Sequence, residues 1–325
     1  MELKPERSNN STSSPKSQVE VPLDETMSNS NVSTDSATLT LATLNTFGVP
    51  FARKTRARLA TVARELNHPT LDVVCLQEVQ MARYVPLLTQ AFTHFPFAAF
   101  EPFIYAPKGG LMTLSRRQFE QTDFLLYRER GWWHTLSIAD WMLHKGALLT
   151  RMTVFGTPVI VINTHLIANY DGDWSHDNRY AQIEATELRQ LAGLVNRQDP
   201  AALIVVAGDF NFPRRSWLYH EFVEAIGAED PLSDHTAPTF RPPFLLDPSL
   251  AEAIDHVFIR PPRGVLIGHT AELLFEHKVR LVGGRRAYVS DHLGISVTLQ
   301  WPRQHPDSHT YSHHASKGFD GPRAG

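Results

Sequence analysis

Apolar runs of strand length alternate with amphipathic stretches of helical length along most of the chain. An apolar run of about four to eight residues is typical of a buried strand, and apolar residues three or four apart are typical of a helix that covers a sheet. Strand-plus-helix pairs of this kind are typical of α/β proteins. The pattern predicts such pairs at 38–44 with 55–66, 71–77 with 82–91, 159–163 with 178–195, and 203–207 with 217–226.

Further strand-like runs are not each followed by a helical pattern. Because several of them follow one another directly, they favour two packed, mixed sheets flanked by helices over a doubly wound sheet. No internal repeat or domain boundary interrupts the pattern. These runs are 110–114, 119–127, 147–154, 254–259 and 295–299.

The two ends of the chain differ from the part between them. Residues 1–36 are rich in Ser, Thr, Asn and charged residues, so they bury too little apolar surface to offset the entropy of ordering. We therefore expect a disordered leader at 1–36 and one folded domain at 37–302. Residues 303–325 contain four histidines among Pro, Ser and Gly, and we expect a flexible tail there.

Charge and hydropathy narrow the classes of partner. The net charge is −3, and residues 1–36 account for it with three basic and six acidic residues. The remainder is close to neutral and lacks the broad basic surface of a non-specific nucleic-acid binder. No apolar run reaches the length of a membrane span, and no secretory signal is readable in residues 1–10. A cytoplasmic protein is the default expectation, and its oligomeric state is left open.

Several of the predicted strands end at polar side chains. In α/β proteins, ligands gather where strands end, so these side chains are expected to meet at one pocket. Gly208 is expected to let the backbone turn sharply there. Each residue alone could instead be a turn or cap residue. The side chains are Asn45, Glu78, His165, Asp209 and Asn211, joined by Asp255-His256 and Ser290-Asp291-His292 before later strands.

The ordered set of motifs resembles that of the endonuclease/exonuclease/phosphatase superfamily, over residues from about 38 to 300. The resemblance implies a four-layer α/β sandwich, a Mg²⁺ site for which Mn²⁺ could substitute, and hydrolysis of a phosphoester. Carboxylate and amide oxygens suit a hard divalent cation. The motifs are Leu44-Asn45, Leu76-Gln77-Glu78, Asn163-Thr164-His165, Gly208-Asp209-Phe210-Asn211, Ile254-Asp255-His256 and Ser290-Asp291-His292.

The resemblance also implies a role for each residue. Glu78 would be a metal ligand, Asn45 would support the metal or its water, and Asp291 would add a carboxylate. His292 would be the general base, oriented by Asp255, and His165 would be the general acid or a transition-state donor. Asp209 and Asn211 would position the water or the phosphate. His256 departs from the family pattern, in which an aromatic residue is frequent at this position.

The substrate has to be inferred from peripheral segments, because the superfamily includes nucleases, inositol phosphatases and sphingomyelinases. The segment 140–146 is similar to a loop of the neutral sphingomyelinase branch, which implies that Asp140 and Lys145 contact substrate or each other. We therefore expect a sphingomyelinase-like phosphodiesterase that acts on a phospholipid headgroup. Trp132, Trp133 and Trp141 flank this loop and would suit peripheral membrane contact.

Two alternatives remain open. Arg53, Lys54, Arg56 and Arg58 could grip the backbone of DNA or RNA in a Mg²⁺-dependent endonuclease or exonuclease, although on a helix they would form a solvated face. The fold could also be a catalytically silent binding module. Since the complete set of carboxylates and histidines is present, catalysis is expected.

Overall fold

The computed structural model of the protein describes residues 36–50, 52–129, 131, 137–242 and 251–303. These residues belong to one compact unit. Apart from Ser36, the predicted leader lies outside the described residues, and so does the predicted tail apart from Arg303. Trp132 and Trp133 also lie outside them.

Two large mixed sheets form the centre of the described part of the chain. The strands of the first sheet are, in spatial order, β10 (Gly268–Leu274), β13 (Gly294–Pro302), β1 (Ser36–Asn45), β2 (Val73–Gln77), β4 (Met112–Ser115) and β3 (Phe97–Ala99). The strands of the second are β5 (Gln121–Leu126), β6 (Gly146–Val154), β7 (Thr157–His165), β8 (Leu203–Asp209) and β9 (Asp255–Arg260). Each sheet has one parallel pair, β1 with β2 and β7 with β8.

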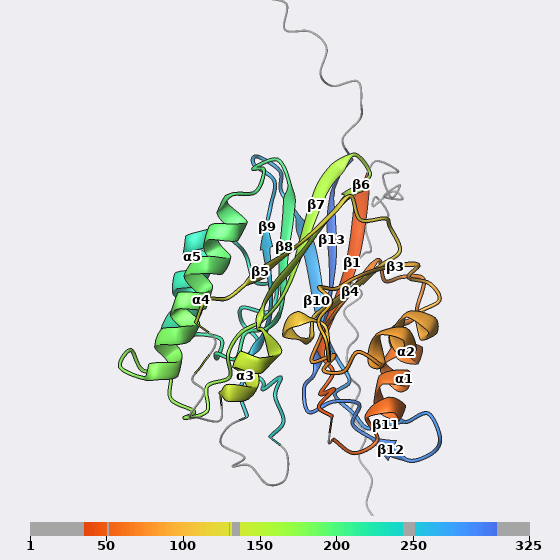
Figure 1. Cartoon of the computed structure of the whole chain (residues 1–325). Coiled ribbons are helices and arrows are strands. Elements are labelled where there is room, and N and C mark those ends of the chain that lie inside the picture. The colour runs from red at the N-terminus through yellow and green to blue at the C-terminus, as the bar shows by residue number, and fades with distance from the viewer. Residues whose placement is uncertain (1–35, 51, 130, 132–136, 243–250, 304–325) are drawn as a thin grey trace, which may run out of the picture. The chain divides into compact units, whose positions relative to one another are not determined.

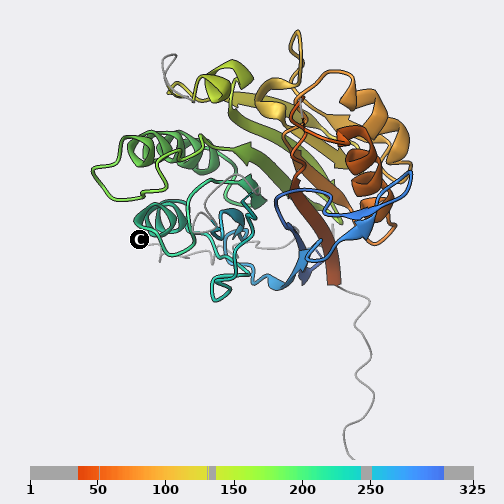
Figure 2. The same ribbon diagram turned by 90° about the horizontal axis from the view of Figure 1, so that it is seen from below.

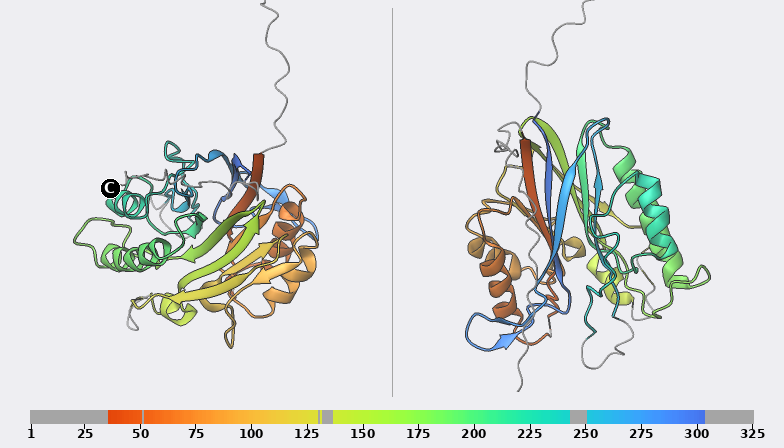
Figure 3. Two further views of the ribbon diagram at one scale, coloured as in Figure 1. Left: turned by 90° about the horizontal axis from the view of Figure 1, so that it is seen from above. Right: turned by 180° about the vertical axis from the view of Figure 1, so that it is seen from behind.

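The longer helices cover the outer faces of the two sheets. Figure 1 shows α1 and α2 beside the first sheet and α4 and α5 beside the second, and Figures 2 and 3 show the same layers from below, above and behind. The predicted four-layer sandwich of two packed mixed sheets flanked by helices is therefore confirmed. The helices are α1 (Thr55–Leu66), α2 (Tyr84–Ala91), α3 (Ile138–Leu143), α4 (Arg179–Asn196) and α5 (Trp217–Ile226).

Local sequence signals explain where the outer helices begin and end. The Asn178 side chain accepts hydrogen bonds from the backbone N–H groups of Tyr180 and Ala181 and caps α4. Ser216 caps α5 in the same way, and Gly227 ends that helix in the left-handed conformation. These are the residue types that satisfy free N–H groups at a helix start and tolerate positive φ at a helix end.

The space between the two sheets is filled by an apolar core, and at one end of the sheets by polar side chains. Val73, Val161, Val205 and Val297 belong to the buried cluster between the sheets. At the carboxyl ends of the central strands this layer becomes polar, and the amide of Gln77 donates to Asn163 Oδ1 across the sheets at 2.7 Å. Burial of apolar surface thus holds the sheets together, while the strand ends present polar groups.

The paired strands and helices expected from periodicity are all present, with ends shifted by a few residues. Periodicity missed the strand β10 and several short elements, which are β3, α3, the hairpin β11 (Val279–Arg280) and β12 (Arg286–Ala287), and the 3₁₀ turn at Lys108–Gly110. The strand predicted from Gly110 begins instead at Met112, because Gly109 and Gly110 both have a φ of 64°. Among the described residues, no helix is both long and apolar enough to cross a membrane.

The sequence predicts a sharp turn at Gly208, but the chain does not turn there. It lies inside β8, opposite Thr164 of β7 and His256 of β9. A Cβ atom at this position would lie 1.9 Å from the carbonyl oxygen of Thr164. The glycine therefore permits close approach of β7, and the chain turns only after Asp209, where Asn211 has a φ of 57°.

We expect Gly208→Ala to lower the free energy of unfolding by about 3 kcal/mol, because backbone would have to move to relieve the clash. Gly227→Ala is the matched control, since it also has positive φ but a Cβ there would meet nothing within 4 Å. The control should lose only about 1 kcal/mol. Urea denaturation measures both, and equal losses would refute the close-approach explanation.

Candidate active site

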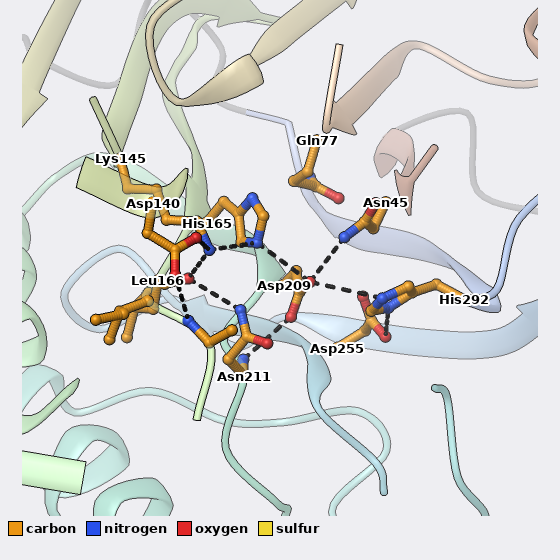
Figure 4. A network of polar contacts seen from close by, with 12 residues as sticks. Asn45, Gln77, Asp140, Lys145, His165, Leu166, Asp209, Asn211, Asp255 and His292 are labelled. Carbon is orange, nitrogen blue, oxygen red and sulfur yellow. Dashed lines mark hydrogen bonds and ion pairs between the residues drawn. The ribbon is translucent and has the colours of Figure 1, made fainter. Parts of the chain in front are cut away.

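The candidate site forms around Asp209, the last residue of β8. Its Oδ2 accepts a hydrogen bond from Asn45 Nδ2 at 2.8 Å. The same oxygen lies 3.4 Å from His165 Nε2 and 3.8 Å from His292 Nε2. Figure 4 shows these side chains converging from opposite sides of the carboxylate. Residues that are far apart in sequence thus meet at the end of the sheets where the strands carry their polar residues.

His292 is held by a second carboxylate. Its Nδ1 lies 2.9 Å from Asp255 Oδ2, at the start of β9, and both side chains are buried. Burial alone would lower the pKa of His292, but the negative charges of Asp255 and then Asp209 raise it to about 10. The imidazole therefore holds a proton strongly, with Nδ1–H donating to Asp255 and Nε2 directed to Asp209.

His165 has the opposite electrostatic setting. Burial, and after it the positive charges of Lys145 and His292, lower its pKa well below the ordinary value. The Lys145 Nζ donates to His165 Nε2 at 2.9 Å. His165 is consequently neutral in this structure, and its Nδ1 has no hydrogen-bond partner within the described part of the chain.

The ammonium group of Lys145 has three hydrogen-bonding or ion-pair partners within the protein. Besides His165, its Nζ contacts Asp140 Oδ1 at 2.8 Å and the carbonyl oxygen of Leu166 at 2.5 Å. Asp140, on α3, also accepts a hydrogen bond from the hydroxyl of Tyr170 at 2.9 Å. The two residues predicted to contact each other or substrate are thus paired, and they join α3 to the segment that follows β7.

Glu78 and Asp291 supply an acidic pair next to these histidines. Burial and then the charge of Asp291 raise the pKa of Glu78 to about 7. Burial likewise raises the pKa of Asp291. Within the described residues, Glu78 Oε2 is buried and has no hydrogen-bond partner. A buried, unpaired carboxylate oxygen next to a second carboxylate fits a hard divalent cation, which would relieve both the repulsion and the missing contact.

A second group of possible ligands is less suited to a cation. Atoms of Asp209, Asp255 and His292 lie within 4.8 Å of one another. The charge that holds a proton on His292 leaves no ring lone pair free for a metal, and Asp255 already accepts from that ring. Among the described residues, Glu78 and Asp291 are therefore the better candidate metal ligands.

Strained backbone places two of the site side chains. Glu78 has a φ of 56°, a left-handed conformation that side chains other than glycine rarely adopt, and Asn211 has a φ of 57°. Gly110 packs directly against the backbone of Glu78, where a Cβ atom would lie 3.1 Å from Glu78 Cα. Such strain persists only where surrounding structure holds it, and it is frequent at functional sites.

The two asparagines are oriented by the backbone around them. Asn45 Oδ1 accepts from the N–H of Phe47 at 3.0 Å, which turns its amide toward Asp209. Asn211 Nδ2 donates to Leu166 O at 2.9 Å, and its own N–H donates to Asp209 Oδ1 at 3.1 Å. Both asparagines thus fix the position of the Asp209 carboxylate.

Two supporting residues were not assigned a role from the sequence. Gln77 and Asn163 form the hydrogen bond between the sheets directly behind the site, and Asn163 Nδ2 also donates to Leu76 O at 3.1 Å. Both residues lie inside the quoted motifs, so the signal was present. Their function is to hold together the strands that carry Glu78 and His165.

Arg58 does not belong to a solvated face, contrary to the expectation from its neighbours on α1. It is buried, and its guanidinium donates to the carbonyl oxygens of Thr46, Phe47 and Val289. It therefore clamps the loop after β1 to the loop that carries Asp291. The sequence shows only the helical period of α1. It does not show that a loop from a distant part of the chain covers the face that carries Arg58.

A cleft of about 340 Å³ lies beside the acidic pair. Arg241 stacks over the ring of Tyr288 at 4.2 Å, and Phe47 also lines the cleft. Asp291 is part of the lining, so the cleft leads to the candidate metal ligands. Its remaining lining residues are Arg58, Pro242 and Ser290.

His256 belongs to the core and not to the site. Its ring stacks on Phe212 with centroids 5.2 Å apart, and Nε2 donates to the carbonyl oxygen of that residue at 3.0 Å. Burial, and after it the charge of Arg214, lower its pKa to about 4. A neutral imidazole thus takes the place of an aromatic ring, which accounts for the departure noted in the sequence.

Comparison with known proteins identifies the family. Residues 42–292 match the Endonuclease/Exonuclease/phosphatase family, which is most of the chain. The chain belongs to this family. Members of the family hydrolyse phosphoester bonds.

Individual relatives are more distant. A Drosophila melanogaster protein with the provisional name neutral sphingomyelinase is 27% identical over 284 residues, which is 83% of this chain and 62% of the relative. The chain therefore spans less than two thirds of that relative. Sphingomyelinase C from Streptomyces griseocarneus has the same fold, with a TM-score of 0.62, 18% identity, and coverage of 80% of this chain and 99% of that one. Humanized D. rerio TDP2 also has this fold, with a TM-score of 0.60 and 18% identity. The match covers 81% of this chain and 98% of that one.

We expect the double variant Asp140→Asn/Lys145→Met to raise the pKa of His165, because it removes a positive charge next to Nε2. Changing both partners avoids leaving one buried charge unpaired. NMR titration of the histidine ring measures the pKa. Lys108→Met is the control, since it removes a lysine paired with Glu101 instead. An unchanged His165 pKa in the double variant would exclude the proposed coupling.

Proposed function

We propose that the protein is a Mg²⁺-dependent phosphodiesterase of sphingomyelinase-like type that acts on a phospholipid headgroup. One observation carries the proposal: Asp209, His165 and the His292–Asp255 pair, from distant parts of the chain, meet within hydrogen-bonding or near-contact distances beside the acidic pair Glu78 and Asp291. This arrangement offers a proton acceptor in His292, positively charged hydrogen-bond donors on the side of His165, and carboxylate ligands for a hard cation.

In the proposed reaction, His292 first releases the proton that it holds on Nε2 at rest. A water then attacks phosphorus and loses its proton to the neutral His292 Nε2. The bond between phosphorus and the leaving-group oxygen breaks, and that oxygen takes a proton from solvent and leaves as an alcohol. Asp255 keeps the ring in the required tautomer and stabilises the imidazolium that forms, as a carboxylate partner does for a general base. The raised pKa of His292 gives its neutral form a high affinity for this proton. Asp209, fixed by Asn45 and Asn211, lies opposite Nε2 and orients the water.

Lys145 and His165 form the positively polarised side of the site. Because Lys145 donates to His165 Nε2 in this structure, we assign the positive charge to Lys145 and place His165 between it and Asp209. This pair would stabilise the negative charge that develops on the leaving side. Asp140 fixes Lys145 in place through the 2.8 Å ion pair.

Glu78 and Asp291 would hold the divalent cation, with Asn45 nearby as support. When bound, such a cation would polarise a phosphoryl oxygen and, through its charge, lower the proton affinity of neighbouring groups. Among the side chains named at this site, five carboxylates outnumber four cations, which are Lys145, Arg58, Arg241 and protonated His292. The site thus keeps an excess of negative charge, which favours binding of a cation.

Three observations support a lipid substrate. The curated relative is named as a neutral sphingomyelinase, and the Asp140–Lys145 pair predicted from that branch is formed. The chain outside residues 1–36 is also close to neutral, which disfavours broad contact with a polyanion.

A nuclease is the second candidate. A D. rerio TDP2 structure of the same fold holds a single-strand DNA product. Arg241 lines the cleft beside Asp291 and would face a phosphate backbone. A catalytically silent module is disfavoured, because every carboxylate and histidine of the proposed mechanism is present.

Glu78→Gln is expected to raise the Mg²⁺ concentration needed for half-maximal activity at least about tenfold, because a charged ligand is lost. It should also remove most of the rise in melting temperature that Mg²⁺ gives the parent. Glu224→Gln, an exposed change on α5, is the control and should keep both responses. A Mg²⁺ response in Glu78→Gln equal to the parent's would exclude Glu78 as a ligand.

A substrate panel tests the activity itself. Purified protein is given sphingomyelin vesicles, plasmid DNA, single-stranded RNA and inositol phosphates, each with and without EDTA. We expect EDTA-sensitive release of phosphocholine, and a loss of about 10³-fold or more in His292→Ala, since proton transfer to it is required. Activity confined to nucleic acids would reject the lipid substrate, and full activity of His292→Ala would reject the mechanism.

A further inference from the structure

An exposed apolar surface lies next to the Asp140–Lys145 pair. Ile104 is 88% exposed, and Trp141 and Met142 on α3 are each about half exposed, at 49% and 50%. Ile138 and Tyr105 are also exposed, and we call these five residues the α3 patch. Large exposed apolar side chains that gather in one place mark an interaction surface more often than scattered ones.

Direct contacts join the two segments of the patch. The ring of Phe103 packs edge-on against Tyr105 with centroids 5.2 Å apart, and it lies tilted against the ring of His144 with centroids 4.4 Å apart. The hydroxyl of Tyr105 donates to the carbonyl oxygen of Met142. The loop at 103–105 and the carboxyl end of α3 therefore form one continuous surface.

The patch lies at the catalytic end of the sheets. Figure 1 shows α3 at the end where β1, β7 and β8 finish. Asp140, which precedes Trp141 on α3, points inward and pairs with Lys145 beside His165, as Figure 4 shows. A surface that covers the patch would thus lie at the same end of the sheets as the candidate site.

We propose that the α3 patch docks on the surface of a zwitterionic phospholipid bilayer. The inference rests on the proposed function, in which the scissile phosphate belongs to a lipid held in such a bilayer. The segments 103–107 and 137–144 contain one formally charged residue, Asp140, and it is buried in an ion pair. An uncharged surface with a tryptophan, a tyrosine and a methionine suits the headgroup region of a neutral membrane.

The size of the patch disfavours a second copy as the occupant. Five partly exposed side chains of this kind present on the order of 500 Å². A stable protein–protein interface buries about 800 Å² on each partner. Shallow insertion into a bilayer has no such minimum, because each apolar side chain contributes by itself.

Vesicle binding tests the docking surface without turnover. The full chain carrying His292→Ala is sedimented with vesicles of phosphatidylcholine and sphingomyelin. Adding Ile104→Ser and Trp141→Ser should lower the fraction bound at least about tenfold, since two large side chains no longer insert. Leu266→Ser is the matched control, because Leu266 is 91% exposed but follows the far end of β9. The control should bind within about twofold of the parent.

Two further measurements separate docking from misfolding and from the proposed substrate. The patch variant with His292 intact should keep the parent's melting temperature and its rate on a soluble phosphodiester, bis-p-nitrophenyl phosphate. Brominated phosphatidylcholine should quench tryptophan fluorescence in the parent and less in Trp141→Phe. A protein that cleaves only nucleic acids but binds vesicles through the patch would refute the substrate and support the docking surface.

Other outcomes would overturn the docking proposal. They are no vesicle binding by the parent, equal binding by the patch variant, or an equal loss in the Leu266 control. A dimeric parent that becomes monomeric in the patch variant would assign the surface to self-association instead.

Discussion

The site depends on a buried carboxylate, Asp209, that is held by groups from both sheets. Asn45 ends β1 in one sheet and donates to Asp209 at the end of β8 in the other, at 2.8 Å. A carboxylate buried to this depth is unstable without hydrogen bonds or opposite charge. The donors that stabilise it are also the groups proposed for the reaction, so sheet packing and catalytic geometry are set by the same contacts.

The close packing of the strands makes this meeting possible. At Gly208, β8 approaches the carbonyl of Thr164 more closely than a side chain would allow, and the next residues on the two strands are Asp209 and His165. Behind them, Gln77 and Asn163 join the sheets through a 2.7 Å hydrogen bond. The apolar core fixes the separation of the sheets, and this polar layer fixes their register at the site.

Opposing electrostatic settings distinguish the two histidines. His292 lies between two carboxylates and binds a proton strongly, while His165 lies against Lys145 and stays neutral. Their ring types are identical, so the difference comes from the partners that the fold supplies. The same principle explains His256, which is neutral because it is buried among aromatic rings.

The sequence by itself determined the layered α/β fold, the paired strands and helices, and the set of polar residues at the strand ends. These depend on local periodicity and on the ordered motifs through which the chain resembles its family. Short elements such as α3 were not predicted, because six residues are too few to show a helical period. Arg58, on a helix that was predicted correctly, was placed on the wrong face because a loop from the other end of the chain covers it.

Only the tertiary structure decided how the site is charged. Lys145 and His165 are 20 residues apart, and Asn45 and Asp209 are 164 apart, so no local pattern could reveal that they touch. The pKa of Glu78 and the proton on His292 follow from burial and from neighbours brought in by folding. Contact and desolvation are properties of the packed chain, and for that reason residue identity could nominate the chemistry but not its protonation states.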